Sequence, residues 1–501
     1  MNVGGALTLP EVFLQRARGQ PEAVALRGPQ ETLTYSQLAH RVSRLAGALR
    51  AMGLKRGDRI AAWSENRLEY VELELAAAWL GLIVACLNWR LSAQEQRHCI
   101  QLVSPSACFV SPRYAAALAA LEMQLPNVRT FGADFDGWRD AAAPIEPDAK
   151  VQPEDGLVIL YTSGTTGLPK GALVSQRAML ARAMVFAADY GIGGEDAFIA
   201  WSPLFHMAAT DHSLATLLLG GEVVVCDGLD LPRICETLRR RPVGWLLAMP
   251  GMVDTLAHAL ENAGGPLQRV RMVGAMADLV PPTEIARLSG LVKAPYLNTF
   301  GSTETGLPPA SGSLLPAGER PTSMSKRQSS WCLLKLVDDQ DREVEDGRPG
   351  EMAMRGPTLF SGYWGNDAAN AQAFRGGWFH MGDVFVRRPD GRLDFVDRLK
   401  YLIKSGGENI YPAEIERVLL SHPSVHDAAI VRRADARWGE IPVAFIVMRD
   451  GTALDADAML AFCRERLASY KLPREFRVIA AKDLPRNSTG KILRHELEKR
   501  L

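Results

Sequence analysis

The amino-acid sequence predicts an α/β protein with more than one domain. Segments of helical periodicity alternate with short apolar runs along most of the chain, which is typical of largely parallel sheets covered by helices on both faces. At 501 residues the chain is too long for one simple hydrophobic core, so we expect two or more domains. The sequence has no fixed-period repeat and no low-complexity tract that would indicate another architecture.

The first helix and the first strand are expected before residue 64. Apolar side chains recur at helical spacing from Leu38 to Met52, and Gly53 suits the C-terminal end of a helix. Residues 60–63 form a short apolar run that indicates a strand. The most apolar run, residues 75–87, is too short to span a bilayer and predicts a buried helix or strand.

The alternation continues through the middle of the chain and reappears on a smaller scale at its end. We expect middle strands at residues 157–160, 172–174, 223–225, 243–249 and 271–273, with helices at 231–240 and from about 250 to 261. The last hundred residues indicate a compact α+β unit. Its strands are expected at 428–431 and 443–448, and its helices near Ile415 and Met459.

The overall composition excludes several classes of protein. Lysine plus arginine and aspartate plus glutamate both total 57, so the zero net charge gives no basic footprint for nucleic acid. The seven cysteines are scattered without a Cys-x-x-Cys pair, which indicates neither a zinc site nor a disulfide framework. Free thiols and the absence of a basic, then apolar, signal sequence at the N-terminus predict a cytoplasmic protein without a membrane span.

A loop rich in hydroxyls and glycine follows the expected strand at residues 157–160. From Tyr161 to Gly171 it reads YTSGTTGLPKG. Its hydroxyls can donate to phosphate oxygens, its glycines let backbone N–H groups approach an anion, and Lys170 adds a positive charge. A polar surface loop is the alternative interpretation. The order of residues differs from a Walker A motif, because Lys170 follows proline and precedes glycine, so a P-loop NTPase is less favoured.

This loop resembles the phosphate-binding loop of the adenylate-forming superfamily, which includes acyl- and aryl-CoA synthetases, adenylation domains of peptide synthetases and firefly luciferase. Later motifs extend the resemblance over nearly the whole chain. It implies a large N-terminal domain of two doubly wound sheets plus a small β-barrel, which the short strands expected at 333–337 and 350–354 would join, and a small mobile α+β C-terminal lid. The implied boundaries are 1–397 for the N-terminal domain, 398–402 for the hinge and 403–501 for the lid.

The resemblance implies an ATP site made from several separate motifs. Glycines would let the adenine ring lie flat on the backbone, and Phe300 would stack on its other face. The family usually has tyrosine at Phe300; stacking survives that change, but any hydrogen bond from the phenol is lost. The implied ATP- and AMP-binding residues are Thr162, Ser163, Gly164, Thr165, Thr166, Gly167, Gly274, Ala275, Met276, Asn298, Thr299, Phe300, Gly301, Thr303, Asp383 and Arg398.

A small set of residues is implied to take part in catalysis. Glu304 is a hard oxygen ligand suited to Mg²⁺, and Asp383 can accept hydrogen bonds from both ribose hydroxyls. Lys491 matches the family's C-terminal lysine, and the spacing around it also resembles sites of regulatory acetylation, which would remove its charge. The implied catalytic residues are Lys170, Thr303, Glu304, His206 and Lys491.

The resemblance places the hinge and the CoA contacts in the last quarter of the chain and in one earlier loop. Lys400 stands at the hinge, where a change in backbone torsion would swing the lid. The implied CoA-binding residues are Gly406, Gly407, Trp438 and Arg90. Glycine leaves room for the pantetheine beside the backbone, whereas Trp438 would stack on the CoA adenine or else pack in a core.

An acyl pocket is implied around the Pro-Leu-x-His segment. Its walls would include His206, Met207, Ala208, Met276, Thr299, Gly301 and Gly306. These mostly small or flexible residues suit a medium-chain acyl group or a substituted aryl acid, and no basic residue stands out to pair a second carboxylate. Asp211 and His212 follow closely, and we expect them to be an exposed pair rather than part of the pocket.

The implied activity is a two-step ligase reaction that consumes ATP, with Mg²⁺, and CoA. A carboxylic acid would form acyl-AMP with release of pyrophosphate, and CoA would then take the acyl group as a thioester. Transfer to the phosphopantetheine of a carrier protein, a P-loop NTPase activity and a non-catalytic binding role are the alternatives. The acid itself, a homodimer and acetylation of Lys491 stay open at this point.

Overall fold

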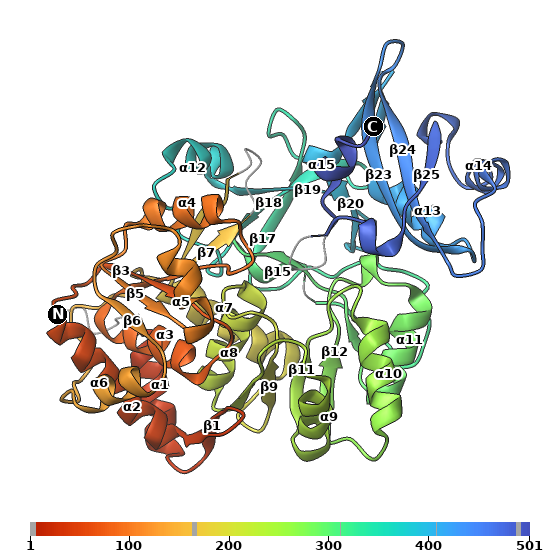
Figure 1. Cartoon of the computed structure of the whole chain (residues 1–501). Helices are drawn as coiled ribbons and strands as arrows, with labels where there is room; N and C mark the ends of the chain where they lie inside the picture. Colours follow the sequence, from red (N-terminus) through yellow and green to blue (C-terminus); the bar gives the residue numbers. More distant parts are fainter. Residues whose placement is uncertain (1–6, 163–167, 311, 407, 487–491) are drawn as a thin grey trace.

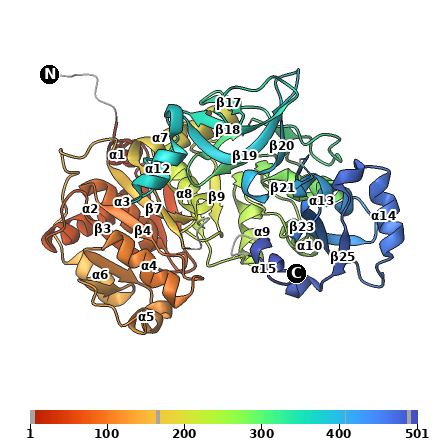
Figure 2. The same ribbon diagram turned by 90° about the horizontal axis from the view of Figure 1, so that it is seen from above.

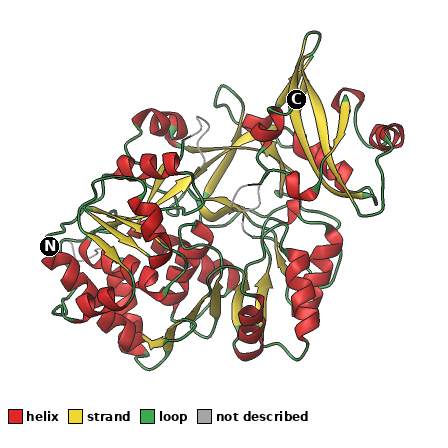
Figure 3. Cartoon of the chain, viewed as in Figure 1, coloured by secondary structure: helices red, strands yellow, loops and turns green. Residues whose placement is uncertain are grey.

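The fold is described from a computed structural model that covers residues 7–162, 168–310, 312–406, 408–486 and 492–501. It confirms the α/β class, with a large N-terminal part built on sheets and a small α+β part at the C-terminus (Figure 1). Figure 3 shows that helices flank the strands of the N-terminal part.

The first sheet of the N-terminal part has the order β6-β5-β3-β4-β7-β8 among the described residues. It is parallel except for β8, which forms an antiparallel hairpin with β7. Its strands are β3 (Arg59–Trp63), β4 (Ile83–Cys86), β5 (Ala107–Val110), β6 (Val128–Thr130), β7 (Gly156–Thr162) and β8 (Lys170–Ser175). The helices of this stretch are α2 (Tyr35–Ala51), α3 (Leu68–Leu80), α4 (Ala93–Val103), α5 (Pro112–Ala119) and α6 (Ala133–Asp140).

The second sheet has the order β16-β13-β12-β11-β9-β10-β1-β2, with a parallel centre and antiparallel edges. Its strands are β1 (Val24–Arg27), β2 (Thr32–Thr34), β9 (Ala197–Ala200), β10 (Glu222–Val225), β11 (Val243–Leu246), β12 (Val270–Val273), β13 (Tyr296–Leu297) and β16 (Leu314–Leu315). The helices that go with it are α1 (Leu9–Gly19), α7 (Gln176–Tyr190), α8 (Met207–Leu219), α9 (Leu231–Arg240), α10 (Val253–Ala263) and α11 (Pro282–Val292).

Helices α3 and α8 are buried on almost every face, and both contribute to one core shared with strands of the two sheets. Figure 2 shows α8 between β7 of the first sheet and β9 of the second. Such a helix carries apolar residues all round, which explains why the run at 75–87 shows no helical stripe. The run divides at Gly81, whose left-handed backbone (φ 65°) ends α3 before β4 begins.

A third group of strands is antiparallel. The four-stranded sheet has the order β17-β18-β19-β20, and the β14–β15 ribbon shares its apolar core. Its elements are β14 (Phe300–Ser302), β15 (Gly306–Ala310), β17 (Leu333–Val337), β18 (Pro349–Arg355), β19 (Phe379–Arg387), β20 (Leu393–Arg398) and α12 (Asp367–Ala373). Among the described residues no ladder joins β17 to β20, and an isolated bridge between Lys326 and Leu393 continues from the β20 edge.

The C-terminal part has its own apolar core, centred on Ile403, Ile415 and Ile430. Its sheet has the order β22-β21-β24-β23, with β25 paired to β24. The elements are β21 (Ile403–Ser405), β22 (Glu408–Ile410), β23 (Val425–Asp435), β24 (Gly439–Met448), β25 (Glu475–Val478), α13 (Pro412–Leu420), α14 (Ala456–Arg464) and α15 (Arg494–Glu498). Within the described ranges, no helix combines the length and the apolar character that crossing a bilayer needs.

Candidate active site

Most of the predicted site residues follow the carboxyl ends of parallel strands. His206 comes after β9, Gly274 directly follows β12, and Thr299 lies just after β13. Since β9, β11, β12 and β13 run parallel in one sheet, their carboxyl ends share one edge. Open α/β sheets bind ligands at this edge, because loops and helix N-termini converge there.

The predicted phosphate loop lies at the end of the β7–β8 hairpin. Thr162 pairs with Lys170 across the hairpin. Ser163, Gly164, Thr165, Thr166 and Gly167 lie outside the described residues. The Lys170 ammonium group lies 4.7 Å from the ring centre of Tyr363, a residue that no sequence motif marks.

Tyr363 joins Lys170 to Glu304. Its hydroxyl donates to Glu304 Oε1 at 2.9 Å. Burial and the neighbouring Glu304 carboxylate raise the pKa of Tyr363, so the phenol stays protonated and can donate. The backbone N–H of Phe360 donates to the Glu304 carbonyl at 2.8 Å. The loop after β18 therefore fixes both the backbone and the side chain of the predicted metal ligand.

Arg182 on α7 contacts the residues around Glu304 from the other side, and no sequence pattern marks it as a site residue. It donates to the carbonyl of Thr303 at 3.0 Å, to the carbonyl of Thr358 at 3.1 Å and to Asp211 Oδ2 at 2.8 Å. Its side chain is 1% exposed and that of Asp211 is 2% exposed. Gly306 has φ 75°, and a Cβ there would lie 2.9 Å from the guanidinium group. The turn that carries Glu304, the predicted metal ligand, is thus built around the buried Arg182–Asp211 ion pair.

The segment predicted to carry adenine is shaped by close contacts. A Cβ on Gly274 would lie 2.1 Å from the Tyr296 ring, so only glycine fits beneath that ring. Trp245 Nε1 donates to the Gly274 carbonyl at 2.7 Å. Met276 has a left-handed backbone (φ 47°), which is uncommon outside glycine and asparagine. A Cβ on Gly301 would lie 2.0 Å from the carbonyl oxygen of Gly306.

Asn298 and Phe300 are both engaged within the protein. Asn298 is buried, and its Oδ1 accepts a hydrogen bond from Lys326 Nζ at 2.7 Å. Lys326 is also paired with Asp278, so its buried ammonium group links the Asn298 and Asp278 segments. The Phe300 ring stacks on Phe395 at 5.3 Å.

The predicted ribose residues form an ion pair. Asp383 and Arg398 lie opposite each other on β19 and β20, and Arg398 Nε donates to Asp383 Oδ1 at 3.0 Å. The negative charge of Asp383 raises the pKa of Arg398. Asp383 is buried, whereas Arg398 is partly exposed. The pair therefore presents a carboxylate and a guanidinium group side by side.

The predicted hinge begins directly after this pair. Lys400 is exposed in a short 3₁₀ turn (Leu399–Tyr401). Beneath it, buried Asp397 accepts hydrogen bonds from the backbone N–H groups of Arg398 at 2.6 Å and Ala413 at 2.7 Å. Burial raises the pKa of Asp397 to about 6, while the nearby guanidinium group of Arg494 opposes the rise.

The predicted CoA contacts lie in two places. Trp438 is 37% exposed, and its ring covers Gly406 so closely that a Cβ there would come within 2.7 Å. The guanidinium groups of Arg437 and Arg474 lie 4.8 and 5.9 Å from that ring. Arg90 stacks on Trp89 at 4.5 Å, next to the His206 segment. Gly407 and Lys491 lie outside the described residues.

The expectation that Asp211 and His212 form an exposed pair is wrong. Both lie within α8, which is buried on nearly every side, and each is 1% exposed. Asp211 is buried because Arg182 neutralises its charge, and His212 is buried among aromatic rings. His206, by contrast, caps α8 and accepts a hydrogen bond from the Ala208 N–H at 3.3 Å, so Met207 and Ala208 form the first turn of that helix.

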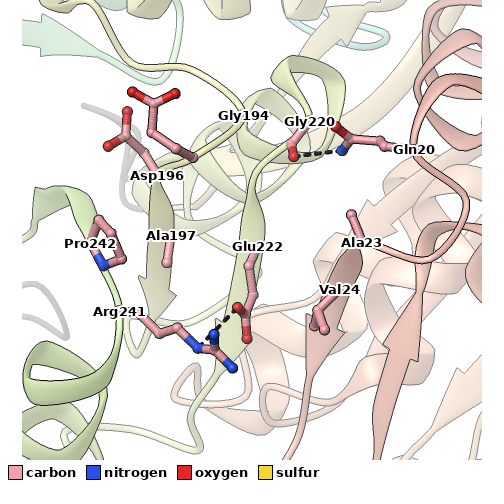
Figure 4. Close-up of a pocket in the computed structure, with 11 residues that line it drawn as sticks. Gln20, Ala23, Val24, Gly194, Asp196, Ala197, Gly220, Glu222, Arg241 and Pro242 are labelled. Atoms are coloured by element: carbon pink, nitrogen blue, oxygen red, sulfur yellow. Dashed lines mark hydrogen bonds and ion pairs between the residues drawn. The ribbon is translucent and has the colours of Figure 1, made fainter.

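A separate pocket lies at the opposite edge of the second sheet. Figure 4 shows its lining, which includes Glu222 paired with Arg241 at 3.4 Å and Gln20 bound to the Gly220 carbonyl at 2.7 Å. Its volume is about 230 Å³. It lies at the amino ends of β1, β9, β10 and β11, so it is not part of the candidate active site.

Comparison with known proteins defines the class. The family model of AMP-binding enzymes matches residues 13–364, and the model of the AMP-binding enzyme C-terminal domain matches residues 414–491. The chain therefore belongs to the AMP-binding enzyme family, which confirms the resemblance stated from its sequence. Its class is that of the AMP-forming acid–thiol ligases.

Individual relatives agree with this class. The chain is 33% identical over 502 residues to an indoleacetate–CoA ligase of Aromatoleum aromaticum, covering 98% of each chain. It is 34% identical over 493 residues to a feruloyl-CoA synthase of an Amycolatopsis species, covering 97% of this chain and 98% of the relative. A solved o-succinylbenzoate CoA synthetase of Bacillus subtilis, in complex with its acyl-adenylate intermediate, superposes with a TM-score of 0.84 at 28% identity, covering 98% of this chain and 99% of that one.

Proposed function

We propose that this protein joins an aromatic carboxylic acid to CoA in two steps that consume ATP. The contact that carries the proposal is the Tyr363 bridge between Lys170 and Glu304, because it brings a cation and a metal-type carboxylate together beside the predicted phosphate loop. The named relatives act on aromatic acids, which favours an aryl over a medium-chain substrate.

In the first step, a carboxylate oxygen of the acid would attack the α-phosphorus of ATP. The bond to the bridging oxygen would break, and pyrophosphate would leave. A carboxylate is already ionised at neutral pH, so the chain has only to position the reactants in line and to neutralise phosphate charge. Lys170 and the Thr162 loop would do this at the phosphates, and Asp383 with Arg398 would hold the ribose.

Mg²⁺ fits the residues around Glu304. Among the described residues, no group of three or more His, Cys, Asp or Glu side chains is arranged to hold a metal by itself. Mg²⁺ needs no such group, since it takes one or two carboxylates together with phosphate oxygens and waters. Tyr363 engages Oε1 of Glu304, and the second oxygen would be the ligand. When bound, Mg²⁺ would neutralise charge on the phosphates.

In the second step, the CoA sulfur would attack the acyl carbon and AMP would leave, while the thiol proton passes to solvent. Trp438 with Arg437 and Arg474 would meet the CoA nucleotide, and the pantetheine would pass Gly406 once the Trp438 ring, which lies over that glycine, moves aside. We place Lys491 at the first step and Lys400 at the pivot between the two poses of the lid, with the boundaries 1–397, 398–402 and 403–501. Acetylation of Lys491 would remove its positive charge and so suppress the first step.

A pyrophosphate-release assay tests the proposal. Purified protein with MgATP and CoA should release pyrophosphate and AMP only when an aromatic acid is present, and should form one thioester per AMP. Glu304→Gln should abolish the release, whereas Glu319→Gln, in a loop outside the candidate site, should not. Orthophosphate release without AMP, or no product with any acid, would contradict the proposal. AMP formation with a carrier protein but not with CoA would favour the carrier-loading alternative.

A further inference from the structure

Strand β19 forms a wide bulge where it passes β18, and the last residue of this bulge is Asp383. Between two paired positions β18 advances by two residues while β19 advances by four, so Met352 lies opposite the whole segment 381–383. Gly382, in the middle of the segment, has a left-handed backbone (φ 72°). Bulges bend a strand and re-aim its side chains. The direction of the Asp383 carboxylate therefore depends on the conformation of this bulge.

The side chain of Glu351 on β18 holds the bulge. Its Oε1 accepts a hydrogen bond from the backbone N–H of Gly382 at 3.0 Å. A bulge disrupts the ladder of backbone hydrogen bonds, and a buried N–H needs another partner. Glu351 is 9% exposed, so its carboxylate supplies that partner inside the protein.

Glu351 is itself held by two side chains. Its Oε2 accepts a hydrogen bond from Arg375 Nη2 at 2.5 Å and lies 3.2 Å from His380 Nδ1. The Arg375 guanidinium group also donates from Nε to Asp341 Oδ1 at 2.9 Å, so it bridges two carboxylates. The side chain of His380 is 2% exposed. Because both oxygens of Glu351 are engaged, the carboxylate keeps one orientation.

Glu351 acts from the face of the sheet that lies away from Phe300. Met352 and Phe385 belong to the apolar core that Phe300 packs against, and the rings of Phe385 and Phe300 are 4.7 Å apart. Side chains alternate along a strand, so Glu351 points to the opposite face from Met352. Asp383, two positions before Phe385, lies on the Phe300 face. The connection from Glu351 to Asp383 therefore runs through the backbone of the bulge.

We propose that Glu351 is a positioning residue of the nucleotide site. By accepting the Gly382 N–H, it holds the bulge in the conformation that aims Asp383 at both ribose hydroxyls of ATP. Without Glu351 the bulge rearranges to find another partner for that N–H, and Asp383 no longer reaches both hydroxyls together. This inference rests on the proposed function for the assignment of Asp383 to the ribose. It adds a side chain that sets ribose recognition without touching the nucleotide.

Calorimetry with ATP and 2′,3′-dideoxy-ATP, in the absence of any acid, tests this role. The wild type should bind ATP at least about 30-fold more tightly, because each hydrogen bond from a hydroxyl to a carboxylate contributes about tenfold or more. Glu351→Leu should bring the two dissociation constants within about threefold of each other by weakening ATP alone. The affinity for 2′,3′-dideoxy-ATP should change less than about twofold. A general loss of stability would weaken both nucleotides alike and leave their ratio unchanged.

Two further variants control the experiment. Glu343→Leu removes an exposed carboxylate from the hairpin next to β17 and should keep the wild-type ratio. In the Asp383→Asn background, Glu351→Leu should change the ratio by less than about twofold, because both residues act through one contact. If Glu351→Leu does not fold, Arg375→Met takes its place. This change at a partly exposed arginine loosens the Glu351 carboxylate and should lower the ratio at least about threefold.

The outcomes separate this inference from the proposed function. A wild-type ratio in folded Glu351→Leu, or in Arg375→Met where the first variant does not fold, overturns the role of Glu351. Equal affinity of the wild type for both nucleotides overturns it together with the ribose contact of Asp383, while the ligase chemistry stands. Failure of every acid to release pyrophosphate contradicts the proposed ligase activity alone, because the nucleotide affinities are measured without an acid.

Discussion

Replacing Arg182 by methionine should destabilise the protein and make its stability depend on pH. The change leaves Asp211 as a buried carboxylate without its 2.8 Å partner, and it strips a donor from the carbonyls of Thr303 and Thr358. Breaking a fully buried ion pair from one side costs about 3–5 kcal/mol. Because the Asp211 side chain is 2% exposed, solvent cannot replace the lost guanidinium group.

The pH dependence follows from the fate of Asp211. Burial already raises the pKa of this carboxyl, while Arg182 lowers it. Without Arg182, the folded-state pKa rises further above the unfolded value, so the folded state binds more protons than the unfolded state. The free energy of unfolding of Arg182→Met then falls as pH rises above the unfolded pKa, by up to about 1.4 kcal/mol per pH unit. The free energy of unfolding that Arg182→Met loses relative to the wild type should be smaller at pH 5 than at pH 8.

Urea unfolding followed by tryptophan fluorescence measures this effect. The double variant Arg182→Met/Asp211→Leu should recover much of the loss and abolish its pH dependence, because no uncompensated charge remains. Arg240→Met removes an arginine from an exposed pair on α9 and should change the unfolding free energy by less than about 1 kcal/mol. If Arg182→Met matches the wild type within about 1 kcal/mol at pH 8, the buried pair does not hold the turn as argued.

Three further predictions concern the site itself. Tyr363→Phe should lower kcat/KM for MgATP at least about tenfold, because Glu304 loses a charge-assisted hydrogen bond, while calorimetry should find AMP affinity unchanged. Equal losses for both nucleotides would contradict the role of Tyr363 in positioning Glu304 for the metal. As pH rises from about 4 to 6, the wild-type free energy of unfolding should fall by up to ~3 kcal/mol, because the raised pKa of Asp397 makes folding take up a proton in that window. Asp397→Asn should remove this fall, and an unaltered pH profile in urea melts would argue against it. Lys491→Ala should cripple adenylate formation but spare CoA transfer from pre-made acyl-adenylate, and equal losses in single-turnover assays of both steps would refute its placement in the first step.

Local patterns predicted most of the elements, and they failed where the structure depends on distant residues. The helix at 231–240 and the strand at 333–337 coincide with α9 and β17, because periodicity and capping are local properties. The polar triplet from Thr210 to His212 has the composition of a solvated surface. It is buried because Arg182, from the preceding helix, supplies the opposite charge.

The same limit explains the residues that were missed at the candidate site. Tyr363 lies 59 positions from Glu304, in a loop whose sequence carries no catalytic pattern. Lys326 is 28 positions from Asn298 and would be expected on the surface from its type alone. Which strands of the β17–β20 sheet form its edges is a tertiary property that the pattern of a single strand does not specify.

The position of Arg182 has a consequence for substrate choice. Asp211 and His212 are neighbours on α8, and Asp211 is tied through Arg182 to the Thr303 carbonyl beside Glu304. A substitution that shifts α8 to accommodate a different acid therefore also moves Asp211, and with it the Arg182 contact to the turn that carries Glu304. Buried, close-packed elements transmit such shifts rather than absorbing them. Redesign of the acyl pocket should consequently start from Phe198 on β9 and Trp245 on β11, whose rings contact His212 without carrying the Arg182 contact.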